Sequence, residues 1–293
     1  MASISRSRLF RTLLLAVMIG MPPVGSMAEA QRAIPDDNLA YPVLITLKNG
    51  NAGSGFYLNN GKAVYLVTAK HVLFDPATQK LLDVSLDLLS YSKDPADSTR
   101  NLLTLDLSVL QNDDNIKPHP SEDVAVVKVF TINSSTAGTG GTPFSLSPVP
   151  GVTAKEQSKG GVLGAALDTV KLFDQVLTGN DVMVFGYPIS LGLQQLPKLD
   201  IHRPLLRKGI VAGTNPEKRS IILDCPSYFG NSGGPVLELD RETFQTHLKI
   251  IGVISQYVPF VDMGGSKTFI MQMASNSGYS IATPMDFVLD LVK

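Results

Sequence analysis

The sequence has few of the residues that crosslink a protein, bind metals or give it a strong charge. It contains one cysteine, four histidines and a formal net charge of −1 over 293 residues. A single cysteine excludes an intramolecular disulfide, so stability must come from a hydrophobic core. The small net charge implies no general attraction to nucleic acid or to anionic lipid. No Cys/His cluster with metal-ligand spacing occurs in the sequence, so we expect no metal site.

Near the N-terminus the chain has a single short apolar run, residues 13–21, preceded by three arginines. About 20 apolar residues are needed to cross a bilayer, so this run is too short to span comfortably. Small residues follow at Ala28-Glu29-Ala30. The pattern predicts a secretory signal peptide over residues 1–30, cleaved after Ala30, with an uncleaved membrane anchor as the alternative. We therefore expect export to a periplasm or to the medium, without stable membrane insertion after cleavage.

The remainder, residues 31–293, has the composition of a folded domain and the pattern of an all-β protein. Apolar residues make up 44% and charged residues 17% of the sequence. Short β-branched runs alternate with turn signals such as Asn49-Gly50. In the last nine residues, Phe287, Val288 and Leu291 are apolar and have the spacing of one face of a helix. These patterns predict the following organisation: a first barrel over about 41–130, a loop-rich connection over about 131–180, a second barrel over about 181–284 and a C-terminal helix over about 285–293.

Three short segments carry residues suited to nucleophilic catalysis. "VTAKHV" contains His71, "SEDVAVVKV" contains Asp123 and "GNSGGP" contains Ser232. A serine hydroxyl stays protonated at neutral pH, so it needs a neighbouring imidazole to accept its proton. A carboxylate on the far ring nitrogen then fixes the tautomer of that imidazole. Each of these roles has one strong candidate in the sequence.

These segments resemble the three signature motifs of the trypsin-like, chymotrypsin-fold serine proteases, and their order along the chain is the order of that family. The resemblance covers roughly residues 41–290 and is closer to bacterial exported Deg-type protease domains than to digestive enzymes. It implies two packed six-stranded antiparallel β-barrels with a short C-terminal helix. Because the sequence stops at Lys293, no PDZ domain is expected after the peptidase domain.

The resemblance also implies a role for each residue. His71 is the general base and then the general acid, Asp123 orients it, and Ser232 attacks the carbonyl carbon to form an acyl-enzyme. The backbone amides of Gly230 and Ser232 form the oxyanion hole. The implied activity is a serine endopeptidase that acts on proteins or peptides and needs no metal or organic cofactor.

Substrate contacts are implied at Ser227, Ser255, Gln256 and Tyr257. Ser255 is expected to support Asp123, while Gln256 and Tyr257 lie on the strand that pairs with the substrate backbone. No carboxylate occurs in "CPSYFG", so a substrate Lys or Arg has no evident charge partner and we expect a small or medium apolar residue at the cleavage site. Tyr257 either narrows the specificity pocket or only packs.

Several features depart from the pattern or leave alternatives open. Asn231 stands where zymogen-activated relatives carry an aspartate, so activation by a new N-terminus is not expected. Cys225, in an apolar run, is interpreted as a buried inert thiol. The other histidines, His119, His202 and His247, are expected in surface or loop positions.

Two other functions are compatible with parts of the sequence. Residues 230–234 also fit the G-x-S-x-G nucleophile elbow of α/β-hydrolases. That elbow needs a helix directly after the serine, whereas Pro235 and a strand pattern follow here. The second alternative is a catalytically silent protease-fold module that binds extended peptides by strand pairing.

Overall fold

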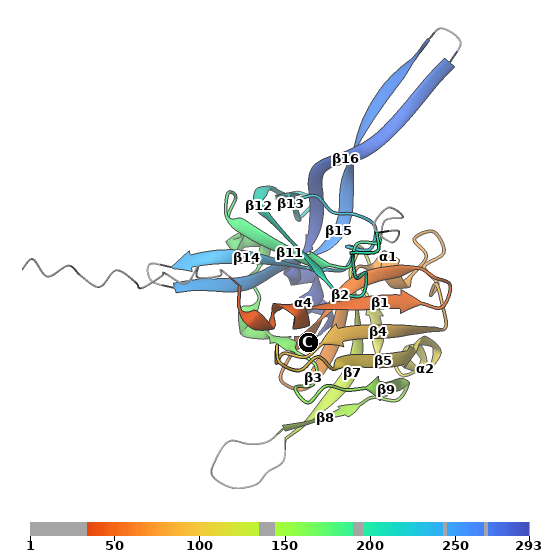
Figure 1. The fold of residues 1–293 in the computed structure, drawn as a ribbon, viewed down its shortest axis with the longest axis vertical. Helices are drawn as coiled ribbons and strands as arrows, with labels where there is room; N and C mark the ends of the chain where they lie inside the picture. The colour runs from red at the N-terminus through yellow and green to blue at the C-terminus, as the bar shows by residue number, and fades with distance from the viewer. Residues whose placement is uncertain (1–33, 135–143, 190–195, 243–244, 267–268, 293) are drawn as a thin grey trace, which may run out of the picture. The chain divides into compact units, whose positions relative to one another are not determined.

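The computed structural model describes residues 34–134, 144–189, 196–242, 245–266 and 269–292 (Figure 1). The predicted signal peptide lies outside these residues. The described chain consists mainly of β-strands with a few short helices, which confirms the all-β fold class. In these ranges no helix is both long enough and apolar enough to span a bilayer.

Strands from residues 42–166 form a ten-stranded sheet. The main path runs β6-β7-β3-β2-β1-β4-β5-β9, while β8 pairs with β7 and β10 pairs with β2. All of these pairs are antiparallel except β10 with β2. The strands are β1 (Pro42–Leu47), β2 (Ala52–Asn59), β3 (Ala63–Thr68), β4 (Ser85–Tyr91), β5 (Arg100–Asp106), β6 (Ile116–Pro118), β7 (Ala125–Ser134), β8 (Phe144–Pro148), β9 (Val152–Glu156) and β10 (Gly164–Ala166).

The first sheet therefore has ten strands instead of the six that were expected. Seven of them, β1 to β7, start within the range predicted for the first barrel, and β8, β9 and β10 come from the segment that was expected to be a loop-rich connection. Four of the five residues of β9 are exposed. Such a strand has no apolar alternation to reveal it, and it forms because a neighbouring strand offers backbone hydrogen bonds.

The second lobe is a closed barrel of six strands in the order β11-β12-β13-β16-β15-β14, as the resemblance implies. Its strands are β11 (Asp181–Gly186), β12 (Leu205–Asn215), β13 (Ser220–Asp224), β14 (Pro235–Glu242), β15 (Gln245–Ser266) and β16 (Phe269–Pro284). Closure leaves no unpaired edge within the barrel. However, β15 and β16 are far longer than the other strands, and their paired ends extend beyond the barrel in Figure 1.

The helices are short. They are α1 (Lys70–Leu73), α2 (Leu107–Asn112), α4 (Met285–Leu291) and the 3₁₀ turns η1 (Asp36–Ala40), η2 (Leu167–Thr169) and η3 (Phe173–Gln175). Asp106 begins α2, because its carboxylate accepts the backbone N–H groups of Ser108 and Val109. The predicted terminal helix is present as α4.

One hydrophobic cluster joins the two lobes. It contains Phe56 from β2, Phe185 from β11 and Leu237 from β14, together with Met285 and Val288 from α4. Separate clusters fill the interior of each lobe. The two lobes therefore share one packed core.

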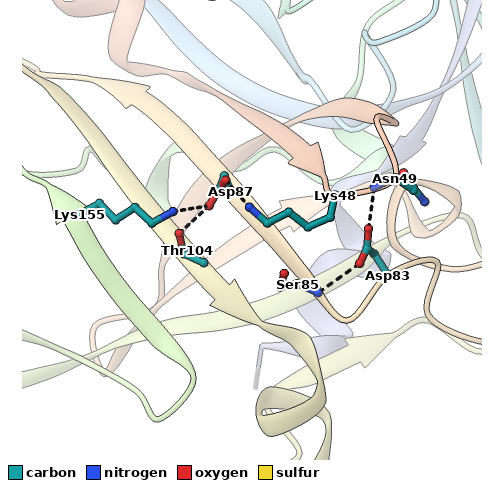
Figure 2. A network of polar contacts seen from close by, with 7 residues as sticks. All are labelled: Lys48, Asn49, Asp83, Ser85, Asp87, Thr104 and Lys155. Atoms are coloured by element: carbon teal, nitrogen blue, oxygen red, sulfur yellow. Dashed lines mark hydrogen bonds and ion pairs between the residues drawn. The ribbon is translucent and has the colours of Figure 1, made fainter.

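A polar network links the strands of the first lobe on its surface (Figure 2). The Asp87 carboxylate contacts Lys48 Nζ at 2.7 Å and Lys155 Nζ at 3.2 Å, and it accepts the Thr104 hydroxyl at 2.5 Å. Partial burial opposes ionisation, but the hydrogen bonds from Lys48, Thr104 and Lys155 outweigh it and lower the Asp87 pKa to about 2. The network ties β4 and β5 to their neighbours.

Candidate active site

His71 and Asp123 make a two-point contact. Helix α1 starts directly after β3, and His71 is its second residue. The backbone N–H of His71 donates to Asp123 Oδ1 at 3.0 Å, and ring atom Nδ1 lies 2.7 Å from Asp123 Oδ2. A carboxylate can only accept, so this contact requires the ring proton to be on Nδ1. Nε2 is then free to accept a proton from another group.

The loop that carries Asp123 is ordered by His119, which was expected in a surface or loop position. His119 lies in a loop, but it is buried, with 8% of its surface exposed. Its Nδ1 accepts the backbone N–H of Glu122 at 3.0 Å and of Ser121 at 3.3 Å, which closes the turn just before Asp123. This loop histidine is buried because its ring meets the ring of Phe287 on α4 edge to face.

Residues Tyr228 to Asn231 form a tight turn directly before Ser232. The Asn231 N–H donates to the Tyr228 carbonyl at 2.9 Å, and Gly230 has a φ of +92°. A positive φ at the third position is the mark of a type II turn, and glycine adopts it without strain. The Phe229 carbonyl accepts the N–H of Ile189 at 2.9 Å. The Phe229 C=O and the Gly230 N–H belong to one trans peptide group and point in opposite directions, so the Gly230 N–H faces away from Ile189.

The amides that the resemblance assigns to the oxyanion hole are uncommitted. Across the described ranges, neither the Gly230 N–H nor the Ser232 N–H has a hydrogen-bond acceptor. Two adjacent free donors of this kind can bind an anionic oxygen.

Ser54 of β2 holds this turn in place and was missed by the sequence analysis. It is fully buried, and its hydroxyl donates to the Gly230 carbonyl at 2.6 Å while accepting the Tyr187 N–H at 2.9 Å. Its own N–H donates to the Ser232 carbonyl at 2.8 Å. One residue of the first lobe thus fixes both sides of the turn in the second lobe. The available signal was a polar residue between two glycines in an apolar strand.

Ser232 lies beside the segment that carries His71. Gly233, with a φ of +89°, packs so closely that a Cβ there would overlap the Ser54 carbonyl and the Thr68 hydroxyl and would lie 3.0 Å from the Ala69 nitrogen. Ala69 is two residues before His71. The Ser232 hydroxyl itself makes no hydrogen bond to any described residue, His71 included.

Asn231 helps to order the turn through a neutral hydrogen bond. Its side chain is buried, and Oδ1 accepts the Tyr228 N–H at 3.1 Å. The turn therefore relies on neutral hydrogen bonds from its own backbone and from Ser54.

The candidate substrate residues lie around this turn. Ser255 and Gln256 line a cleft of about 600 Å³ together with His71 and Asp123. The ring of Tyr257 meets the ring of Phe229 edge to face, 5.6 Å between centroids. Ser227 is buried, and Asn276 Nδ2 donates to its carbonyl at 2.6 Å.

One expected contact differs. Ser255 was expected to support Asp123, but its hydroxyl donates its single proton to the Ile281 carbonyl at 3.1 Å. The local reason is a bulge in β15 between Ile254 and Gln256, which turns Ser255 toward β16. Asp123 is instead held by both nitrogen donors of His71.

Comparison with known protein families gives one match. The family model described as "Trypsin-like peptidase domain" matches residues 53–243, about two thirds of the chain, and this range contains His71, Asp123 and Ser232. A search of curated protein sequences finds no match.

Similar solved structures include "Deg5" (18% identity, 87% of this chain and 88% of that chain, TM-score 0.48). Another is a thermostable serine protease, AL20, from an extremophilic microorganism (11% identity, 88% and 96%, TM-score 0.49). A third is a serine endoprotease from Yersinia pestis (15% identity, 88% and 65%, TM-score 0.42).

Proposed function

The chain belongs to the trypsin-like peptidase domain family, and from this premise we propose that it is a serine endopeptidase with His71, Asp123 and Ser232 as its catalytic residues. The observation that carries the proposal is the pair of contacts between His71 and Asp123, which leaves Nε2 of the imidazole as a proton acceptor. The family implies proteins as substrates.

The proposed reaction begins when His71 Nε2 takes the proton of the Ser232 hydroxyl. Oγ forms a bond to the substrate carbonyl carbon, and the carbonyl electrons move to the oxygen. The C–N bond then breaks, and the leaving amine takes the proton from His71 Nε2. Water attacks the resulting acyl-enzyme by the same proton path and releases the acid. Asp123 stabilises the charged imidazole through Nδ1.

The Gly230 and Ser232 amides are the proposed donors to the developing oxyanion. The free state of both N–H groups and the type II turn support this role. Losing one such donor typically costs about 2.7–4 kcal/mol in the transition state. Gln256 and Tyr257 are proposed to bind the substrate backbone, and the contact of Tyr257 with Phe229 supports a narrow pocket near Ser227.

We also propose that the protein is exported by cleavage of residues 1–30 and acts in a periplasm or outside the cell on extended segments of proteins. The sequence pattern of the first thirty residues supports export. Edman sequencing of the mature protein tests it, and a first residue of Gln31 is expected.

Labelling with a fluorophosphonate probe tests the catalytic assignment. The folded protein is expected to react at Ser232, and Ser232→Ala is expected to abolish labelling. Ser145→Ala, at an exposed position on β8, is the matched control and should label normally. Labelling that persists in Ser232→Ala would refute the assignment.

The second candidate function is a silent module that binds extended peptides. The observation in its favour is that the Ser232 hydroxyl makes no hydrogen bond to His71. Catalytic hydrogen bonds often tighten only when substrate binds, so the enzyme remains the better reading. An unlabelled but folded wild-type protein would favour the module.

A further inference from the structure

Beyond the barrel, β15 and β16 continue as a two-stranded ribbon that we call the arm, residues 259–266 and 269–276. Its pairing runs from Pro259 opposite Asn276 to Ser266 opposite Phe269. Within the described residues, β15 and β16 pair only with each other along this length. The ribbon therefore leaves the body of the protein, as Figure 1 shows.

The arm exposes large apolar side chains. The exposed fractions are 57% for Phe260, 45% for Val261, 68% for Met263 and 59% for Met273. A two-stranded ribbon without a packed face is marginally stable in water. Clustered exposed apolar side chains mark binding surfaces, and methionine adapts to varied partners. The arm is therefore suited to bind an apolar partner.

The distribution of these side chains favours an added strand over a flat partner. Neighbouring residues of a strand point to opposite faces, so Phe260 and Asp262 lie on one face while Val261 and Met263 lie on the other. Met273 is opposite Asp262 and shares its face. A flat dimer interface would need the apolar groups on one face. A strand added at the edge places its own side chains alternately above and below the ribbon, so it contacts the apolar side chains on both faces.

The part of β15 that is the candidate substrate-binding strand leads directly into the arm. The last residue of β15 that is paired with β14 is Val253, opposite Pro235. Beyond it, Ser255 and Gln256 border the cleft with His71, and β15 continues through a second bulge, between Tyr257 and Pro259, into the arm. Pro259 has no N–H, and prolines within strands occupy positions whose N–H side faces away from the partner strand. With a period of two, the N–H groups of Val261 and Met263 face outward along this edge.

We propose that the arm extends the substrate cleft by strand pairing, so that the protein captures long, extended, apolar polypeptide segments. This inference rests on the proposed function, because it takes Ser232 as the point of cleavage. β15 runs away from Ser232, so an antiparallel partner runs toward it. The residues on the N-terminal side of the cleaved bond therefore lie along the arm. From Tyr257 to Gly264 the edge is about 23 Å long at about 3.3 Å per residue.

Peptide binding to the Ser232→Ala protein tests the arm without requiring catalysis. The probes are two fluorescein-labelled peptides of alternating Val and Ser, four and twelve residues long, measured by fluorescence anisotropy. The longer peptide is expected to bind at least about tenfold more tightly, because it alone reaches the arm.

Two proline substitutions locate the binding edge. Val261→Pro removes an outward N–H on the β15 edge, and Ala274→Pro removes the corresponding N–H on the β16 edge, since the two residues are directly opposite. Both place a proline at the same level of the ribbon, so they share any general strain. Val261→Pro is expected to abolish the length advantage, while Ala274→Pro keeps it. Equal effects of the two substitutions would refute strand pairing at the β15 edge.

Cleavage by the wild-type protein tests the direction. Extending a fluorogenic peptide on the N-terminal side of the cleaved bond should raise kcat/KM at least about tenfold, and extending the C-terminal side should not. Gain only from the C-terminal side would overturn the proposed orientation.

The outcomes separate the two proposals. If the wild-type protein is not labelled by the fluorophosphonate, but still binds the long peptide more tightly and loses this advantage in Val261→Pro, the peptidase proposal is refuted and peptide binding by the arm is supported. Normal labelling without any length dependence would refute the arm alone. Sedimentation velocity tests whether the arm instead binds a second copy of the chain. If the protein is an oligomer that Val261→Pro dissociates, and peptide affinity does not depend on peptide length, the arm is a dimerisation surface and the proposal is wrong.

Discussion

At the scale of single residues, the candidate active site depends on one buried hydroxyl. Ser54 donates to the Gly230 carbonyl and accepts the Tyr187 N–H, so it connects the turn before Ser232 to both lobes. A buried hydrogen bond of this kind contributes most through the groups that its loss leaves unsatisfied. We therefore expect Ser54 to position the Gly230 amide.

We expect Ser54→Ala to lower the rate of fluorophosphonate labelling by about tenfold or more, because the Gly230 N–H loses its fixed direction. The free energy of unfolding should fall by about 1–3 kcal/mol, since a buried carbonyl and a buried N–H lose their partner. A time course of fluorophosphonate labelling measures the rate, and chemical denaturation measures the free energy of unfolding.

Ser90→Ala is the matched control, because Ser90 is similarly buried in the first lobe but its hydroxyl faces Tyr57 of the same lobe and not the turn before Ser232. It should leave labelling unchanged. If Ser54→Ala and Ser90→Ala label at the same rate, Ser54 has no positioning role.

At the scale of elements, side-chain contacts tie strands that are distant in sequence. Asp87 on β4 joins Thr104 on β5, Lys155 on β9 and Lys48 next to β1 (Figure 2). These contacts hold β9, which the sequence did not reveal as a strand, against the rest of the sheet. The network is partly exposed, so its contribution is reduced by solvent screening.

Asp87→Asn should reduce the free energy of unfolding at pH 7 by about 1 kcal/mol. The folded pKa of Asp87 is about 2 and lies below its ordinary value of 3.8, so its ionised form stabilises the fold above pH 4. That stabilisation is lost as the pH falls toward 2. Urea denaturation at pH 7 and pH 2.5 measures the difference between wild type and variant, which should shrink at the lower pH.

The control is Asp174→Asn, because the carboxylate of Asp174 is largely exposed and lies 3.9 Å from Arg219 Nη1. It should change stability by no more than a few tenths of a kcal/mol at either pH. A difference for Asp87→Asn that does not depend on pH would show that the charge is not the cause.

At the scale of the whole molecule, the two lobes share one core and should unfold together. Met285 and Val288 of α4 are fully buried in the cluster that contains Phe56 of the first lobe and Phe185 of the second. Neither lobe can lose this cluster without exposing apolar surface of the other.

We expect calorimetry of residues 34–293 to show a single transition, because the shared core couples the lobes. Met285→Ala should lower the free energy of unfolding by about 2–5 kcal/mol and shift that one transition. Met263→Ala, at a highly exposed position on the arm, is the matched control and should change it by less than about 0.5 kcal/mol. Two resolved transitions, with only one shifted by Met285→Ala, would contradict the coupling.

The sequence by itself determined the elements with strong local patterns. β-branched runs, the Asn49-Gly50 turn and the apolar spacing after Pro284 indicated the all-β class and the terminal helix, because hydrophobic period and turn chemistry are local properties. The three motifs singled out His71, Asp123 and Ser232, whose catalytic roles stay predictions.

The tertiary structure alone decided the contacts between segments. The hydroxyl of Ser54 reaches Gly230 across 176 residues, and nothing near either residue encodes that meeting. The polar strand β9 forms only because β5 offers it a partner, and Ser255 turns from Asp123 toward Ile281 because β15 bulges. Such contacts depend on which edges and carbonyls the folded chain brings together, and a pattern read along one strand cannot contain that information.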